Sequence, residues 1–269
     1  MAPKLFDKQY LQAEFEKLDG LLAAPVNLYL IGGGSMSFQK YKTATKDIDV
    51  VVRSDDELKI IKTALKSIGY TVPVISGSYE QMGARAIFEN TDEFRWDIFV
   101  NVICDGLQLS DGMINRSQEL FKLKNISVHM ISPEDIFVFK AITTRERDRE
   151  DMYSLFSKGL DFEIIKKEII WQNENKLTDF AWLAYFFTGL EEFFNQYSIY
   201  HPVFEELQDI AYEDMLIGMV KDKLKSQPMK IKDLSSDFEI EDVKAILKLL
   251  VEHGLVFKNK DGEFSLIHI

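Results

Sequence analysis

Three aspartates stand where catalytic or metal-binding carboxylates could act. Asp47 and Asp49 lie two residues apart in the apolar segment DIDVVV, and Asp97 lies between apolar residues in FRWDIFVN. Residues two apart on a strand project from the same face, so Asp47 and Asp49 should point the same way. Neighbouring carboxylates repel each other unless one is protonated or a cation lies between them. A hard divalent cation with oxygen ligands suits this arrangement, and Mg²⁺ is the ion that the pattern predicts.

A glycine run precedes the first two aspartates. In IGGGS, Gly33, Gly34 and Ser35 follow an apolar strand-like segment, and eleven residues separate Ser35 from Asp47. Glycines let the backbone approach a phosphate closely, and a serine adds a hydroxyl donor. The run matches neither G-x-x-x-x-G-K-[ST] nor G-x-G-x-x-G, and by itself it could equally be a structural turn. Together with the aspartates, it predicts phosphate and metal binding within one short segment.

The third carboxylate has two possible roles. An isolated buried carboxylate needs a cationic partner, and Asp97 could pair with Arg95 on the same strand face. It could instead join the other two aspartates in a two-metal site for phosphoryl or nucleotidyl transfer, in which one ion activates an acceptor oxygen and the other stabilises the triphosphate. Glu89 and Glu93 are the alternatives to Asp97.

This combination resembles the DNA polymerase β-type nucleotidyltransferase superfamily. Its signature is Gly-Gly or Gly-Ser, about nine to thirteen further residues, and Asp-x-Asp or Asp-x-Glu between apolar residues. The match covers residues 28–52, with Asp97 in the place of the third family carboxylate. The resemblance implies transfer of NMP from an NTP to a hydroxyl acceptor on RNA, protein or a small molecule, with two Mg²⁺ ions. The implied catalytic and metal-binding residues are Asp47, Asp49 and Asp97, and the implied nucleotide-binding residues include Gly33, Gly34 and Ser35.

A second segment, FVFKAITTRERDREDMYSL, resembles AbiEii-like and minimal nucleotidyltransferases of prokaryotic toxin–antitoxin and phage-defence systems. They carry a helix with a lysine, followed by an Arg-x-x-Asp-x-x-Asp-like run. The resemblance implies that Lys140, Arg147 and Asp148 bind the nucleotide, because lysine and arginine would meet the triphosphate in a site otherwise full of carboxylates. The alternative is a solvated, salt-bridged helix start.

The elements that must position these residues lie within residues 1–158. Strand-like runs are NLYLI, DIDVVVR, ARAIFEN, FRWDIFVNVI and ISVHMI, and helical patterns lie between them. A first helix is predicted over residues 5–22, and two later ones have clear start signals, Ser54 before three acidic residues and Ser132 before a proline. The pattern predicts an α/β (α+β) nucleotidyltransferase fold with a mixed sheet.

Two further domains are predicted after this one. Residues 159–208 show helical patterns alone, and residues 209–269 show three helices and a hairpin signal at Asp261-Gly262, the order of a winged helix-turn-helix. In the third of these helices acidic residues outnumber lysines, which disfavours a helix that contacts phosphates. We therefore expect weak or no DNA binding, and a protein partner or a homodimer for this module.

Composition limits the possible partners. The formal net charge of -12 argues against non-specific nucleic-acid binding but permits a local basic groove. The one cysteine, Cys104, excludes a disulfide framework. The N-terminal residues lack the apolar core of a signal peptide, and the most apolar stretch, residues 180–197, is interrupted by glycine and glutamate. A cytoplasmic location without membrane contact is the expectation.

Two functions are compatible with the sequence. The first is an active metal-dependent nucleotidyltransferase. The second is a non-catalytic DNA- or protein-binding regulator that retains the nucleotidyltransferase fold. Three carboxylates favour the first, because a protein without catalysis has no need of them.

Overall fold

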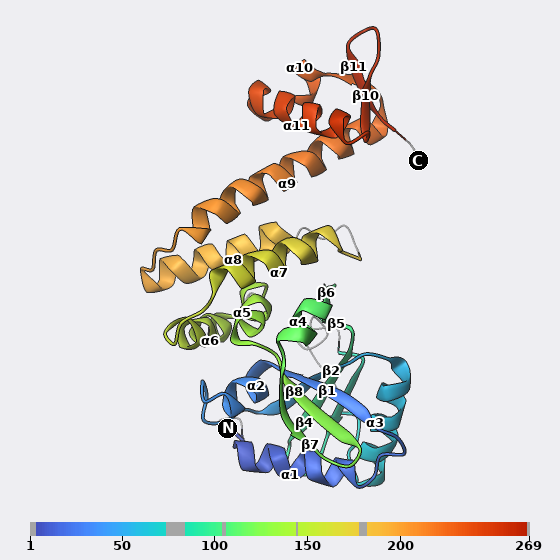
Figure 1. Cartoon of the computed structure of the whole chain (residues 1–269), viewed down its shortest axis with the longest axis vertical. Coiled ribbons are helices and arrows are strands. Elements are labelled where there is room, and N and C mark those ends of the chain that lie inside the picture. The colour runs from blue at the N-terminus through green and yellow to red at the C-terminus, as the bar shows by residue number, and fades with distance from the viewer. Residues whose placement is uncertain (1–3, 74–83, 104–105, 144, 178–181, 268–269) are drawn as a thin grey trace. The chain divides into compact units, whose positions relative to one another are not determined.

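The computed structural model describes residues 4–73, 84–103, 106–143, 145–177 and 182–267, so Cys104 lies outside the described residues. The chain forms two compact units, Met1–Ile199 and Tyr200–Ile269, and Figure 1 shows the elements of each. The domain boundaries expected after residues 158 and 208 stay predictions.

The first unit is built on one mixed sheet. Its order is β6-β5-β4-β2-β1-β8-β7, with β3 paired to β4. The central strands β2 and β4 are parallel, as are β1 and β8, whereas β1 and β2 are antiparallel. The strands are β1 (Val26–Ile31), β2 (Asp47–Val52), β3 (Ala86–Glu89), β4 (Arg95–Val100), β5 (Val102–Ile103), β6 (Leu107–Gln108), β7 (Gln118–Lys122) and β8 (Ile126–Met130). The predicted α/β class with a mixed sheet is confirmed.

The helices of this unit begin where side chains can cap them. Ser54 forms a complete capping box with Glu57 at the start of α3, and the Ser132 hydroxyl accepts from the backbone N–H of Asp135 at the start of α5. The first helix begins later than predicted, because Asp7 caps it. The helices are α1 (Lys8–Asp19), α2 (Gly32–Phe38), α3 (Asp55–Ser67), α4 (Asp111–Arg116), α5 (Pro133–Ala141), α6 (Glu146–Phe156), α7 (Phe162–Glu174) and α8 (Trp182–Tyr197).

The core of the sheet lies between its strands and helices α1 and α3. Leu11 and Phe15 of α1 belong to one buried cluster with Leu30 and Trp96 of the sheet. The rings of Phe15 and Trp96 meet edge to face, with 5.2 Å between their centroids. Each such side chain stabilises the fold by roughly 1.5–3 kcal/mol when buried, so this layer fixes the strands that carry the aspartates.

A second layer packs around α5, which contacts α6, α7 and α8. Helix α8 comes so close that a Cβ built on Gly189 would lie 1.8 Å from the carbonyl oxygen of Ala141. The last turn of α5 is further held by buried Arg149, whose guanidinium donates to the carbonyl oxygens of Lys140 and Thr143. These contacts fix the end of α5 and the start of α6.

The second unit has its own core. Leu216, Val220, Val243 and Phe264 are among the residues buried in one cluster. The strands form a three-stranded sheet, β10-β11-β9, in which β10 and β11 are the predicted hairpin. Its elements are α9 (Val203–Ser226), β9 (Met229–Lys230), α10 (Ile231–Leu234), α11 (Ile240–Glu252), β10 (Val256–Lys258) and β11 (Glu263–Leu266). Within the described ranges, no helix of either unit combines the length and the apolar character that a membrane span requires.

We expect Gly189→Ala to destabilise the first unit by about 1–3 kcal/mol, because its methyl group would overlap backbone atoms of α5. Gly20→Ala at the end of α1, in the same unit, is the matched control, since its φ of -65° suits alanine and its Cβ would come no closer than 3.9 Å to a neighbouring atom. All three tryptophans lie in the first unit, so urea unfolding followed by tryptophan fluorescence reports on that unit. An unchanged fluorescence midpoint in Gly189→Ala would show that α8 can move away from α5.

Candidate active site

The pairing of β2 with β4 brings the predicted carboxylates together. Asp49 lies opposite Asp97 across the parallel strands, and Asp47 lies opposite Arg95. One carboxylate oxygen from each of Asp47, Asp49 and Asp97 lies within 4.8 Å of the other two. We call these three residues the acidic triad. Glu89 and Glu93, the alternatives to Asp97, do not belong to this cluster.

Burial makes the charge of the triad costly. Asp49 and Asp97 are buried, while the side chain of Asp47 is 20% exposed. Burial, together with repulsion from Asp47 and Asp97, raises the pKa of Asp49 well above its usual range. Burial and the nearby Asp47 also raise the pKa of Asp97 to about 7, although Arg95 opposes this shift. Asp97 is therefore poised to exchange a proton for a cation near neutral pH.

Arg95 occupies part of this site. Its Nη2 donates to Asp97 Oδ2 at 2.8 Å and to Asp47 Oδ2 at 3.2 Å. The predicted ion pair between Asp97 and Arg95 therefore exists, but Arg95 also contacts Asp47. One guanidinium cannot neutralise the charge of all three carboxylates of the triad.

The donor set fits a divalent cation. Asp97 Oδ1 is buried and has no hydrogen-bond partner among the described residues. A buried, unpartnered carboxylate oxygen beside two other carboxylates is the environment that a hard cation would satisfy. The residues that would hold it are Asp47, Asp49 and Asp97.

The first glycine of the run is required by the triad itself. Gly32 has φ +59°, in the left-handed region, and a Cβ on it would lie 2.4 Å from Asp49 Oδ2. Glycine adopts this conformation without strain and leaves the carboxylate in place. The backbone can therefore turn from β1 into α2 directly beside Asp49.

The predicted phosphate-binding residues lie in two different environments. Gly33 lines the cavity over the triad together with Gly32. Gly34 packs against Leu30, and Ser35 is fully buried with its hydroxyl accepting from Gln39 Nε2 at 2.9 Å. Gly34 and Ser35 therefore lie behind the turn and do not line the cavity.

Helices α5 and α6 supply the predicted cations, one of them already paired. Buried Lys140 donates to Asp148 Oδ1 at 2.6 Å, and its Nζ lies 2.8 Å from Asp151 Oδ2. Burial alone would lower the pKa of Lys140, but these two carboxylates raise it above the usual value. Burial alone would raise the pKa of Asp148, yet Lys140 and Arg145 lower it to about 2. Asp148 is thus fully engaged in holding cations, while Lys140 lines the triad cavity with its charge balanced.

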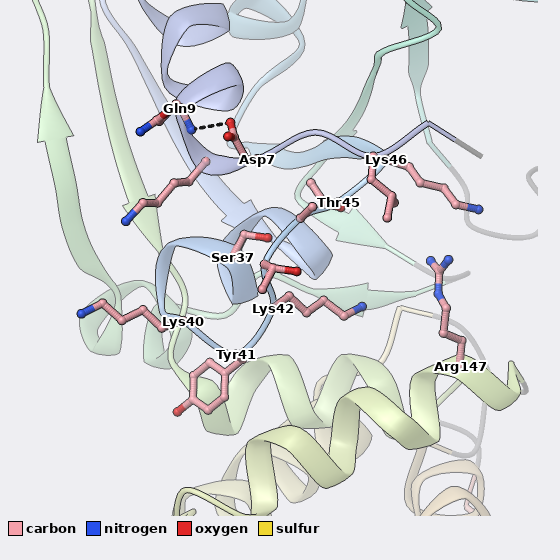
Figure 2. A pocket seen from close by; sticks show the side chains of 13 residues that line it. Asp7, Gln9, Ser37, Lys40, Tyr41, Lys42, Thr45, Lys46 and Arg147 are labelled. Carbon is pink, nitrogen blue, oxygen red and sulfur yellow. Dashed lines mark hydrogen bonds between the residues drawn. The ribbon is translucent and has the colours of Figure 1, made fainter. Parts of the chain in front are cut away.

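Arg147 is placed differently. It is exposed, lines the triad cavity, and forms no ion pair with any described residue. Figure 2 shows its guanidinium reaching from α6 toward the segment that carries Lys42 and Lys46. Arg147 is therefore a predicted nucleotide-binding residue with a free charge at the cavity.

Residues 39–46, between α2 and β2, contribute site residues that the sequence prediction did not name. Lys42, Thr45 and Lys46 line the triad cavity. Lys42 is tied to α6 through Asp151, with 2.5 Å between its Nζ and Oδ1. The available signal was the density of basic residues directly before Asp47. The cavity thus combines carboxylates suited to a metal with cations suited to phosphate.

We expect Mg²⁺ to stabilise the protein more at about pH 8 than at about pH 6. Because the pKa of Asp97 is raised to about 7 in the folded state, its stabilising contribution is present at low pH and is lost as the pH rises through 7. A cation must displace this proton and would remove the repulsion that remains at high pH. Thermal unfolding with and without millimolar Mg²⁺ measures the effect, and Asp97→Asn should reduce its pH dependence. An equal shift at both pH values would argue against metal binding at the triad.

Three comparisons with known proteins bear on this site. A family model described as "Nucleotidyltransferase of unknown function (DUF6036)" matches residues 9–186. Among solved structures, JHP933 from Helicobacter pylori is 10% identical, with a TM-score of 0.34, and the alignment covers 92% of this chain and 94% of that one. A second H. pylori protein, described provisionally as a nucleotidyltransferase, is 11% identical with a TM-score of 0.34 and coverages of 92% and 99%. Similarities this low carry no argument about fold or function.

No curated protein matches the sequence. The matched family region contains the acidic triad, the glycine turn and the cations of α5 and α6. It also spans more than half of the chain. The chain therefore belongs to the DUF6036 family of nucleotidyltransferases.

Proposed function

We propose that the protein transfers NMP from an NTP to an acceptor hydroxyl in a reaction that depends on divalent metal ions. The observation that carries this proposal is the acidic triad, with three carboxylate oxygens within 4.8 Å of one another. Membership of a nucleotidyltransferase family supports the reaction type. Mg²⁺ is the proposed ion, because it is bound by one or two carboxylates together with substrate phosphates.

The triad residues have separate roles in this proposal. Asp47 and Asp49 hold the metal ions, and Asp97 completes the acceptor side. When bound, the ions would stabilise negative charge on the phosphate oxygens and lower the pKa of the acceptor hydroxyl. Asp97 helps to activate that hydroxyl by taking up its proton. The acceptor oxygen forms a bond to the α-phosphorus, the bond from that phosphorus to the bridging oxygen breaks, and pyrophosphate leaves with the electron pair.

The nucleotide is held by the cavity wall. The turn at Gly32 and Gly33 permits close approach of the triphosphate, and Arg147 contacts its oxygens with Lys46. Gly34 and Ser35 act indirectly, since their burial behind the turn fixes its conformation. Lys140 and Asp148 likewise act by holding α5 and α6 together.

The second unit is proposed to be a winged-helix module that contacts protein. In α11, the Nζ of Lys244 lies 2.5 Å from Oε1 of Glu241. The Nζ of Lys248 lies 3.9 Å from Oε1 of Glu252, so each lysine has a carboxylate partner. Such a helix is poorly suited to a groove lined by phosphates. A protein partner or a homodimer therefore fits this module better than DNA. The AbiEii-like resemblance and a toxin–antitoxin context remain sequence predictions.

A non-catalytic regulator is the less favoured function. Without a bound cation, the triad holds buried carboxylates with raised pKa values, which is a cost in stability. A protein that only bound DNA or protein would gain from replacing them.

We expect Asp49→Asn and Asp97→Asn each to reduce transfer at least about a hundredfold. Both variants should be as stable as the parent protein in metal-free buffer, or more stable, because each removes like-charge repulsion. The assay is incubation of purified protein with each α-³²P-labelled NTP and Mg²⁺ in a cell extract, followed by separation of the labelled products.

Glu89→Gln is the matched control, since Glu89 lies on β3 next to the site but outside the triad. Its activity should stay close to that of the parent protein. Turnover near the parent rate in Asp97→Asn would remove Asp97 from the mechanism.

A further inference from the structure

A groove with basic walls adjoins the triad cavity. It has a volume of about 760 Å³, within the range of ligand-binding sites, and is formed by α1, residues 37–46 and α6. Figure 2 shows its side chains. We call it the basic groove, after the five cations that line it: Lys8, Lys40, Lys42, Lys46 and Arg147.

The charge of this groove is opposite to that of the chain. The whole protein has a net charge of -12, yet among the described residues the groove is lined by five cations and a single carboxylate, Asp7. That carboxylate is engaged as the cap of α1, where it accepts from the backbone N–H groups of Gln9 and Tyr10 at 3.0 and 2.9 Å. The composition of the chain therefore does not account for this concentration of positive charge.

Most of these cations lack a counter-ion. Lys42 is paired with Asp151, but Lys8, Lys40, Lys46 and Arg147 form no ion pair with any residue in the described part of the chain. Lys8, Lys40 and Arg147 are also exposed. Free cations collected along one groove create a potential that attracts a ligand with several negative charges.

The NTP alone does not explain this number of cations. An NTP carries about four negative charges, and bound divalent ions would offset part of them together with part of the charge of the acidic triad. Lys46 and Arg147 lie at the junction, where they line both the groove and the triad cavity. Lys8 and Lys40 line the groove but not the triad cavity, so an anion confined to that cavity would leave them without a counter-ion.

We infer that the acceptor is a single-stranded nucleic acid, whose phosphates lie along the basic groove and whose terminal hydroxyl reaches the acidic triad. A nucleic-acid strand presents a regular series of phosphates that ends in a hydroxyl, which matches a series of cations that ends at carboxylates. Positive charge concentrated along one groove of an acidic protein would also orient the strand. This inference rests on the proposed nucleotidyl transfer for the role of the strand, but not for its binding.

Binding can be tested without catalysis. The probe is a 5′-fluorescent single strand of about twelve nucleotides, made as RNA and as DNA, and the measurement is anisotropy with the full chain in Mg²⁺ and no NTP. Each phosphate contact contributes about -0.7 to the slope of log affinity against log salt, so the four unpaired cations predict a slope of about -2.8. Affinity should therefore fall about fiftyfold between about 50 and 200 mM salt. The RNA and DNA arms distinguish the two sources of the same phosphate chemistry.

Paired substitutions locate the binding. Lys8→Gln with Lys40→Gln should reduce affinity at least about tenfold at low salt and reduce the slope by about 1.4. Lys122→Gln with Lys124→Gln changes the net charge equally at exposed positions outside the groove and should leave both values unchanged. Tryptophan fluorescence during urea unfolding checks that both variants are folded. Equal losses in the two double variants, or no measurable binding by the parent protein, would overturn the inference.

Transfer is measured separately with labelled NTP and strands that end in a 3′-hydroxyl or a 3′-phosphate. Labelling of the hydroxyl strand alone supports both proposals. Groove-dependent binding without transfer to any acceptor would support the groove as a strand-binding site and overturn the proposed function. Labelling of a protein or a small molecule, without binding of either strand, would overturn the groove inference and leave the proposed function in place.

Discussion

Repulsion among three carboxylates at the centre of the sheet is the constraint around which the first unit is arranged. Asp49 and Asp97 meet across parallel strands, and their burial makes the charged form costly. The surrounding residues limit this cost without removing it. Arg95 bridges two of the three carboxylates, and Gly32 leaves room for the third. The strain that remains is electrostatic, and a bound cation would relieve it.

The positive side of the site is divided into paired and unpaired charge. Lys140 and Lys42 are held by carboxylates of α6, so they fix α5, α6 and residues 39–46 relative to one another. Lys46 and Arg147 are left without carboxylate partners among the described residues and face the cavity. The paired cations provide rigidity, and the unpaired ones provide attraction for anions. A site with all of its cations neutralised would hold its shape but attract little.

The sequence was sufficient for the parts of the site that depend on local patterns. Alternation on a strand places Asp47 and Asp49 on one face, and the start of α5 at Ser132 follows from its capping chemistry. The position of Ser35 was not predictable, because a serine after a glycine turn can face the cavity or the core, and here it faces the core. The basic groove was also missed, since its cations come from α1, residues 40–46 and α6, which only the tertiary fold brings together. The net charge of -12 gives no sign of five cations gathered in one groove.

The close packing of Gly32 against Asp49 has a consequence for how the proposed activity would be lost during evolution. Any side chain at residue 32 would push the carboxylate aside and would also be strained at φ +59°. A descendant that kept Asp47, Asp49 and Asp97 but replaced this glycine would retain the carboxylate signature with Asp49 displaced. The intact aspartates alone would then suggest a working site. Residue 32 would be the position that distinguishes an active protein from an inactive relative with the same three aspartates.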